Sequence, residues 1–500
     1  MLFNSFSYLV FLVVMFALYW AIPVRHRKVL LLVGSYVFYM CWKAEYLLLI
    51  LALTLVNFFI GKKIHCYAGE GAEKLARRKQ FLLLGLVFNL GCLCFFKYSN
   101  FLIDSLFQLL SFGNGALHVT ASQNLTSPAL NIILPLGISF FTFEFICYIV
   151  DIYRGCKPVD SFVELALFAA FFPTQIAGPI KRVKDFMQQM HEAPVFKQEN
   201  FGAGVFLILQ GLFKKVVLGD NMGAIVAQGF NHVTTLPLAD AWLATAGFTF
   251  QIFFDFAGYT DIGRGSALLF GYKVPENFNL PFLAANLTDF WRRWHISLST
   301  WLRDYLFIPM GGSRGGAWNV RRNMMITMVL GGLWHGAAWH YVIWGAFHGT
   351  GLVLSKEWQD FVSANKTLSA LRPSKVWHVS GVALTMFFLF LAGILFRSSD
   401  LPQAFAMTAR LLGIGTPALS GAVAVSFLHS TLVLALPLYI CFVALRSKAA
   451  SAALAAQPFG LIKGAWQRSL PLRLVTCLSI SIMIMGFAPG QLSPFIYFQF

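Results

Sequence analysis

Residues 286–349 of the chain read NLTDFWRRWHISLSTWLRDYLFIPMGGSRGGAWNVRRNMMITMVLGGLWHGAAWHYVIWGAFHG. The first half of this stretch carries charged side chains at Asp289, Arg292, Arg293, Arg303 and Asp304, and the i, i+4 spacing of Asp289 and Arg293 predicts an ion pair. That load is too costly for a bare helix in hydrocarbon. The second half, Met324 to Phe347, is apolar enough to cross a bilayer and still contains His335 and His340. We therefore expect a charged re-entrant or interfacial helix that leads, through a glycine-rich turn, into a spanning helix with buried imidazoles.

The composition of the 500-residue chain is that of a membrane protein, since 58% of its residues are hydrophobic and only 12% are charged. Soluble domains carry about 25% charged residues. Several apolar runs reach the roughly 20 residues that a spanning helix needs. The sequence therefore predicts an all-α, polytopic integral membrane protein.

The net charge of +17 has two interpretations, a nucleic-acid partner or a membrane surface. The basic residues lie in short loops between apolar runs, where they set topology and contact anionic lipid headgroups. We therefore expect membrane lipids as partners and no nucleic acid. The eight cysteines lie mostly inside apolar runs and form no C-x-x-C pair, so the sequence indicates neither a metal site nor a disulfide framework.

We expect about a dozen membrane segments. The apolar runs are Ser7–Ile22, Val29–Trp42, Glu45–Ile60, Phe81–Phe96, Ile132–Tyr153, Phe201–Leu218, Trp242–Gly258, Val376–Phe396, Ser426–Leu445 and Val475–Phe487, beside the central stretch and a segment broken by prolines, Phe168–Arg182. The basic cluster Arg25–Lys28 places the first loop in the cytoplasm and the N-terminus outside. Two of the runs contain a carboxylate, Glu144 and Asp255, and the run with Glu144 is broken by Pro135 and Gly137.

His335 is the strongest candidate for chemistry. It follows glycines in the sequence LGGLWHG, where missing side chains let another backbone or a substrate come close. An ionisable group inside a spanning helix is functional by default, and histidine is the commonest general base. On a continuous helix His295 shares a face with Trp291 and Trp294, which fits a structural role as well as a catalytic one. His340 and His348 are expected to be structural or interfacial.

The glycine-rich loop at 311–315 has two interpretations. Together with Arg314, Arg321 and Arg322 it could hold phosphates through backbone N–H groups and guanidinium forks. It could equally be a cytoplasmic turn with ordinary positive charge. The loop formally matches G-x-S-x-G, but a nucleophile elbow needs a strand before it, so Ser313 is a poor nucleophile candidate.

The central stretch resembles the membrane-bound O-acyltransferase superfamily, above all its bacterial alginate O-acetylase branch, in FWRRWHISLSTWLRDYLFIPMGG and RNMMITMVLGGLWHGAAWHYVIWGAFHG. Supporting segments are MLFNSF at the start, LPLGISFFTFEFICYIVDIYRG at 134–155, FFPTQIAGPIKR at 171–182 and GLFKKVVLGDN at 211–221. The paired W-H-I-S and L-W-H-G motifs are specific to the superfamily. The resemblance covers nearly the whole chain.

The resemblance implies a single transmembrane domain over residues 1–500, with a catalytic core at about 130–350 and C-terminal helices at about 376–490. Tilted helices should surround a thinned centre that is pierced by a funnel. An acyl thioester should enter from the cytoplasm, and the acceptor should be reached from the outer face. The resemblance implies that His335 is the catalytic residue and that His295 lines the same pore.

On this basis we expect an O-acetyltransferase of the bacterial inner membrane that serves an extracytoplasmic polysaccharide such as alginate. The expected donor is acetyl-CoA, with no bound cofactor or metal. Trp294, Trp334 and His295 are expected to shape the site and to steady the developing oxyanion. A periplasmic partner protein is expected to accept the acetyl group, because the chain has no obvious soluble domain to hold a polysaccharide. The alternatives are a transporter or flippase that moves an acyl donor or lipid-linked sugar without chemistry, and a D-alanyl transferase-like relative.

Overall fold

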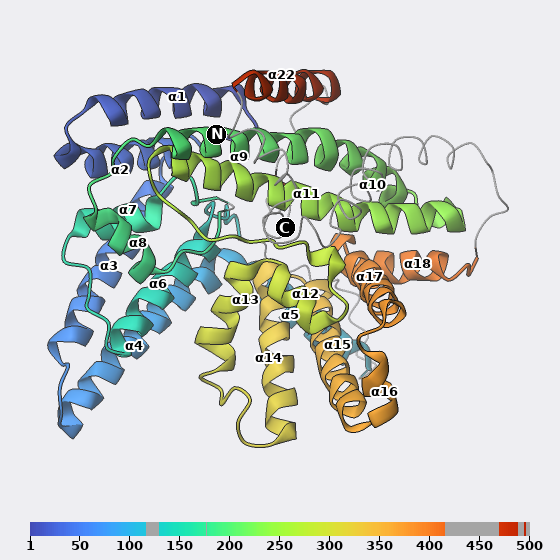
Figure 1. Cartoon of the computed structure of the whole chain (residues 1–500). Helices are drawn as coiled ribbons and strands as arrows, with labels where there is room; N and C mark the ends of the chain where they lie inside the picture. The colour runs from blue at the N-terminus through green and yellow to red at the C-terminus, as the bar shows by residue number, and fades with distance from the viewer. Residues whose placement is uncertain (117–129, 177, 416–469, 489–494, 497–500) are drawn as a thin grey trace. The chain divides into compact units, whose positions relative to one another are not determined.

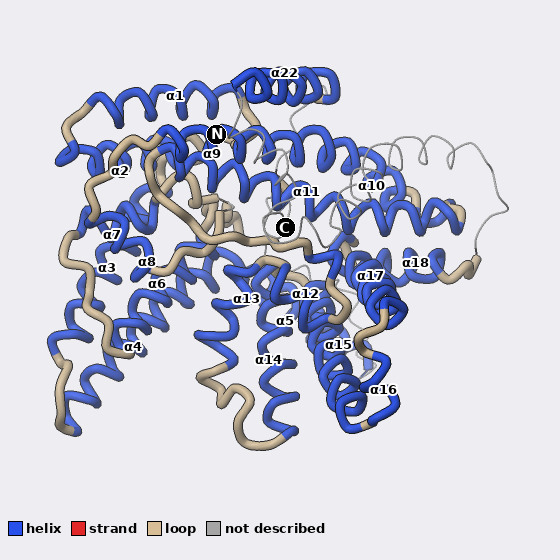
Figure 2. The backbone as a smooth tube through the Cα atoms, in the orientation of Figure 1, coloured by secondary structure: helices blue, strands red, loops and turns tan. Residues whose placement is uncertain are grey.

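The computed structural model describes residues 1–116, 130–176, 178–415, 470–488 and 495–496, and within these ranges all regular structure is helical (Figure 2). The described chain forms two compact units. The first unit comprises Met1–Ala21, Ala177–Ile180 and Pro194–Phe500, and the second comprises Ile22–Ile176 and Lys181–Ala193. The expected single domain stays a prediction.

The second unit is a group of helices packed around α6. Its elements are α2 (Val24–Met40), α3 (Tyr46–Cys66), α4 (Ala72–Leu93), η1 (Cys94–Tyr98), α5 (Ser99–Ala116), α6 (Ile138–Tyr153), α7 (Phe162–Ala170) and α8 (Val183–His191). Helix α6 packs against α3 and α4, and the amides of Asn57 and Asn89 join these two helices through hydrogen bonds of 3.0 and 2.8 Å. Because both amides are buried, the pairing satisfies polar groups that would otherwise oppose burial.

Two sequence features of the second unit are confirmed. The run that begins at Ile132 becomes helical only at Ile138, because Gly137 adopts a left-handed conformation with φ 73°. The proline-rich segment between α7 and α8 is irregular. Its Lys181 is buried and pairs with Glu144 of α6 at 2.8 Å, so the carboxylate predicted inside this apolar run has a counter-charge.

The first unit is built along one long helix, α11. Its elements are α1 (Phe6–Ala21), α9 (Gln198–Leu212), η2 (Phe213–Asp220), α10 (Asn221–Asn231), η3 (Val233–Thr235), α11 (Leu238–Leu269), η4 (Pro281–Leu283), α12 (Leu287–Arg293), α13 (Ile296–Leu302), η5 (Arg303–Phe307), α14 (Ala317–His335), α15 (Trp339–Ala364), α16 (Lys366–Leu371), α17 (Lys375–Arg397), α18 (Leu401–Leu411) and α22 (Leu470–Phe487). Helices α9 and α11 lie side by side (Figure 1). A Cβ atom on Gly211 would lie 2.5 Å from the carbonyl oxygen of Gly258, so glycine is required for this close approach.

A layer of buried ion pairs joins η2 to α11, and we call it the lysine layer. Lys214 pairs with Asp261 at 2.6 Å, and Lys215 pairs with Asp220 at 2.7 Å and also with Asp255. Asp255 further accepts a hydrogen bond of 2.7 Å from the backbone N–H of Ile496, close to the C-terminal end of the chain. The second carboxylate predicted inside an apolar run is therefore also paired.

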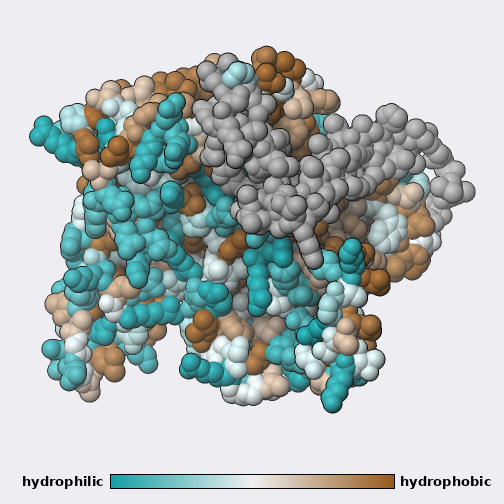
Figure 3. Space-filling model, in the orientation of Figure 1, coloured by the Kyte–Doolittle hydropathy of each residue, from teal (hydrophilic) through white to brown (hydrophobic). Residues whose placement is uncertain are grey.

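Four helical runs of the described residues are long and apolar enough to cross a membrane, namely Tyr46–Cys66, Ala72–Leu110, Gln198–Asn231 and Lys375–Arg397. Several helices also expose apolar side chains, as over α22 in Figure 3, where Leu478 and Met485 are exposed. Such surfaces fit contact with lipid. The all-helical fold with several spans is confirmed. The total of about a dozen stays a prediction, and the predicted span Ser426–Leu445 lies outside the described residues.

Candidate active site

The chain breaks between α12 and α13, and His295 lies at this break. Its backbone is left-handed, with φ 43° and ψ 54°, so the predicted continuous helix with a Trp291–Trp294–His295 face is wrong. The reason is a neighbouring loop, in which Asn277 accepts from the backbone N–H of Ile296 at 2.9 Å and of Ser297 at 3.1 Å. These bonds satisfy donors at the start of α13 that a continuous helix would turn toward its own carbonyls.

Helix α12 itself forms as the sequence predicts. Asn286 is its N-cap and accepts from the backbone N–H of Asp289 at 2.9 Å. Asp289 also pairs with Arg293 at 2.9 Å, one helical turn later. The predicted i, i+4 pair is therefore confirmed, and it absorbs part of the charge that the sequence places beside the site.

The segment predicted as one spanning helix, Met324–Phe347, is instead a helical hairpin. Helix α14 ends at His335, and α15 begins at Trp339. The two helices pack so closely that a Cβ atom on Gly332 would lie 2.2 Å from the carbonyl oxygen of Tyr341. The glycines thus admit another backbone, and the turn that they permit leaves His335 at the end of its helix.

His335 is buried among aromatic rings. Its ring centroid lies 5.0 Å from that of Trp334, 5.1 Å from that of Trp344 and 5.2 Å from that of Phe396. Trp344 also contacts His348, with 4.5 Å between the ring centroids. The hairpin and α17 therefore bring two imidazoles onto the same indole, although His335 and His348 are 13 positions apart in the sequence.

Both imidazoles line a pocket that encloses about 480 Å³ of free space, including the part open to the outside. Its walls come from α11, η4, α12, α14, α15 and α17: Phe248, Thr249, Ile252, Phe282, Phe290, Trp291, Trp294, His335, Trp344, His348, Leu389, Ala392, Gly393 and Phe396. None of these residues is Asp, Glu, Lys or Arg.

His295 is fully buried and is not part of the pocket lining. Its ring contacts Phe256, with 4.7 Å between centroids, and lies 6.1 Å from Trp334. Neither ring nitrogen has a hydrogen-bond partner within the described ranges. Of the residues predicted to shape the site, Trp294 lines the pocket, and Trp334 touches both His295 and His335.

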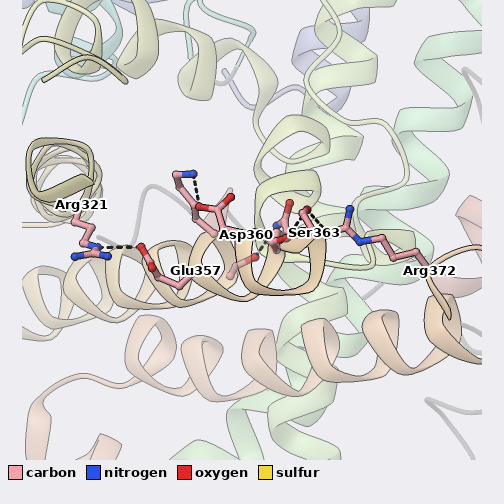
Figure 4. A network of polar contacts seen from close by, with 8 residues as sticks. Arg321, Glu357, Asp360, Ser363 and Arg372 are labelled. Carbon is pink, nitrogen blue, oxygen red and sulfur yellow. Dashed lines mark hydrogen bonds and ion pairs between the residues drawn. The ribbon is translucent and has the colours of Figure 1, made fainter. Parts of the chain in front are cut away.

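The three predicted phosphate-binding arginines lie away from the pocket. Arg321 is 14 residues before His335 on α14, or about 21 Å along the helix axis at 1.5 Å per residue. It pairs with Glu357 of α15 at 2.9 Å (Figure 4), and this hydrogen bond lowers the pKa of the Glu357 carboxyl. Arg322 donates to the side chain of Asn323 at 3.1 Å, and Arg314 lies in an exposed loop. None of the three lines the pocket.

Sequence reasoning gave His348 a structural or interfacial role and gave Trp291 no role in the site. The available signal was the spacing of Trp344 and His348, which places them one turn apart on one face of α15. That pattern alone is typical of a buried helix face. Only the contact between His348 and Trp291 of α12, 5.2 Å between ring centroids, shows that the two line one pocket.

Comparison with known proteins identifies one family. Residues 157–398 match the model of the MBOAT, membrane-bound O-acyltransferase family. The chain is 36% identical to a probable alginate O-acetylase of Pseudomonas aeruginosa and 37% identical to one of Azotobacter vinelandii, over 99% of this chain and of each relative. It is also 34% identical to a peptidoglycan O-acetyltransferase of Helicobacter pylori, over 77% of this chain and 74% of that protein.

Proposed function

The chain belongs to the membrane-bound O-acyltransferase family, and we propose that it passes an acetyl group from a cytoplasmic thioester donor toward hydroxyls of an extracytoplasmic polysaccharide such as alginate. The family makes it an O-acyltransferase. Relatives named for alginate and for peptidoglycan support O-acetylation of a polymer as the reaction. Membership of an acyltransferase family, together with the ion-paired state of Glu144 and Asp255, removes the support for a transporter without chemistry.

One observation carries the proposed mechanism: the His335 imidazole lines an uncharged aromatic pocket with space for a small acyl group. In the proposed step His335 takes the proton of the acceptor hydroxyl as its oxygen attacks the thioester carbonyl carbon. When the intermediate collapses, the carbon–sulfur bond breaks and the leaving thiolate takes that proton. General-base catalysis of this kind contributes about 10²–10⁴-fold.

The donor proposed for this step is acetyl-CoA. Its phosphates would be held by Arg314, Arg321 and Arg322 at one end of α14 while the thioester reaches His335 at the other end. Guanidinium groups suit phosphate because they donate two parallel hydrogen bonds. Trp294 would close the pocket around the acetyl group. Trp334 would hold the His335 ring, with His295 packed behind it.

The acceptor side of the proposal involves a second protein. Among the described residues all regular structure is helical, and no described domain lies outside the two helical units to bind a polymer. We therefore propose a periplasmic partner that accepts the acetyl group and transfers it to the exopolysaccharide. The proposed location is the bacterial inner membrane, with several passes.

The test uses the purified full-length protein in lipid nanodiscs with acetyl-CoA labelled in the acetyl group. The expected result is label on a hydroxyl-bearing acceptor, and a strain without this chain is expected to make polymer without O-acetyl groups. Normal polymer O-acetylation in that strain would contradict the proposal. Transfer from D-alanyl donors in place of acetyl donors would contradict the acetyl assignment and favour the D-alanyl alternative.

A further inference from the structure

His348 is a second imidazole of the pocket, and its Nδ1 atom makes no hydrogen bond within the described ranges. The side chain is only 2% exposed, and its Nδ1 atom has no hydrogen-bond partner there. Its neighbours are rings, Trp344 at 4.5 Å, Trp291 at 5.2 Å and Phe388 at 5.2 Å between centroids. A buried polar group without a hydrogen bond destabilises the fold, and a purely structural role for His348 would give nothing that offsets this.

Trp291 adds a second unused donor beside His348. Its Nε1–H group is buried and finds no acceptor in the part of the chain that the structure describes. An indole N–H can only donate, whereas a neutral imidazole offers one donor and one acceptor. A single ligand oxygen that accepts two hydrogen bonds would satisfy the N–H groups of both His348 and Trp291.

The lining residues of the pocket favour a ligand whose accepting oxygen belongs to an uncharged group in the ground state. Because none of the described lining residues is Asp, Glu, Lys or Arg, they offer no counter-charge to a carboxylate or a phosphate. The polar groups that remain are His335, His348, the indole nitrogens and the Thr249 hydroxyl, which donates to the carbonyl oxygen of Thr245 at 3.2 Å. An acyl carbonyl meets both conditions, since it is neutral and its oxygen accepts two hydrogen bonds.

We propose that His348 and Trp291 form the oxyanion site of the pocket and hold the carbonyl oxygen of the acyl group while His335 acts on the acceptor hydroxyl. The inference rests on the proposed acyl transfer. As the hydroxyl oxygen bonds to the carbonyl carbon, the C=O electron pair moves onto the oxygen, and the hydroxyl proton moves to His335. The N–H groups of His348 and Trp291 stabilise that negative oxygen. Re-formation of C=O then expels the thiolate, which takes the proton from His335.

The test compares three single variants with the wild-type protein in the acetyl-transfer assay. His348→Phe keeps an aromatic ring against Trp344 and Phe388 and removes both nitrogens. His348→Gln keeps an N–H donor. His340→Phe is the matched control, because His340 is also buried on α15 but contacts Tyr341 and lies outside the pocket lining.

His348→Phe is expected to lower kcat by about 10²–10³-fold with the donor KM nearly unchanged, which is the loss typical of one oxyanion donor. His348→Gln should recover at least tenfold of that loss, and His340→Phe should remain near wild type. A kcat near wild type for His348→Phe would overturn the proposal, as would a raised KM with kcat kept. If His348→Phe does not fold, Trp291→Phe replaces it in the test, because it removes the indole N–H and keeps an aromatic ring. The same changes in kcat and KM then support or overturn the proposal.

The two proposals fail in different ways. If the wild-type protein transfers no acetyl group, the proposed function fails. If the wild type is active and His335→Ala is inactive, while His348→Phe and Trp291→Phe both turn over normally, only the oxyanion assignment fails. In that case the two side chains serve as pocket walls.

Discussion

The lysine layer and the aromatic pocket are two buried polar regions that share helix α11. They differ in whether their polar groups are charged and whether those groups have partners. The layer contains full charges, and each has a counter-charge: Lys214 with Asp261, and Lys215 with Asp220 and Asp255. The pocket contains no charged side chain, yet His348 and Trp291 keep polar groups without a partner among the described residues. On one helix, Asp255 and Asp261 face the layer and Thr249 faces the pocket.

This difference distinguishes buried polar groups that stabilise the fold from buried polar groups that can bind a ligand. A buried ion pair is strongly destabilised when one member is lost, so its members are committed to each other. An unpartnered neutral group costs less and stays available to a ligand. Ionisable residues inside apolar segments are therefore functional candidates only after their partners have been counted, and this count favours the imidazoles over Glu144 and Asp255.

The largest expected effect is on the pocket side. His335→Ala should lower acetyl transfer by about 10²–10⁴-fold, because the proposed base is lost, while the protein still folds and inserts. The measurement is transfer by purified variants that match wild type in size-exclusion profile and thermal stability. Near-normal turnover by a well-folded His335→Ala protein would contradict the assignment of His335 as the base. His295 would then become the preferred candidate for the general base.

A substitution in the lysine layer should lower stability and leave activity unchanged, the opposite of the result expected for His335→Ala. Lys215→Met leaves Asp220 and Asp255 buried without their shared cation and should destabilise the protein by about 3–5 kcal/mol. Activity per folded molecule should be kept. Thermal unfolding in detergent measures the loss, with Lys356→Met as the control, because the Lys356–Asp360 pair is exposed. Wild-type stability of Lys215→Met would mean that the layer is not a structural unit.

A smaller effect on stability and on acetyl transfer is expected in the hairpin of α14 and α15, which carries His335. A Cβ atom on Gly345 would lie 2.4 Å from the carbonyl oxygen of Met328, so Gly345→Ala should cost about 1–3 kcal/mol. Transfer should also fall, because α14 must shift. Gly486→Ala is the control, since a Cβ atom there meets no described residue within 4 Å. Unchanged stability and turnover of Gly345→Ala would show that the hairpin is more loosely packed.

The smallest effect is expected for the exposed ion pair at the far end of the same hairpin. Arg321 lowers the pKa of Glu357 in the folded protein, so the pair stabilises the fold above the unfolded carboxyl pKa of about 4.3. This contribution is lost as the pH falls through the folded pKa. Between about pH 7 and pH 3 the melting temperature of Glu357→Gln should therefore fall slightly less than that of wild type. An equal fall in both proteins would assign the pair no role in stability.

Local patterns in the sequence predicted much of this molecule. The apolar runs predicted helices, Gly137 marked the start of α6, and the Asp289–Arg293 spacing predicted an ion pair. The break at His295 was not predictable from its own neighbours, because it depends on Asn277. The pocket was hidden for the same reason: His348 and Trp291 meet only after the hairpin has folded against α12 and α17.

The hydrogen bond from the Ile496 backbone to Asp255 has a consequence for how the protein is made. It joins residues 241 positions apart, so at about 5–20 residues per second a ribosome needs roughly 12–50 seconds to supply the second partner. Throughout that interval the carboxylate on α11 lacks one of its donors inside a largely assembled unit. The newly made protein therefore passes through a state without this bond, in which insertion factors and membrane proteases can act on it before Ile496 has been added.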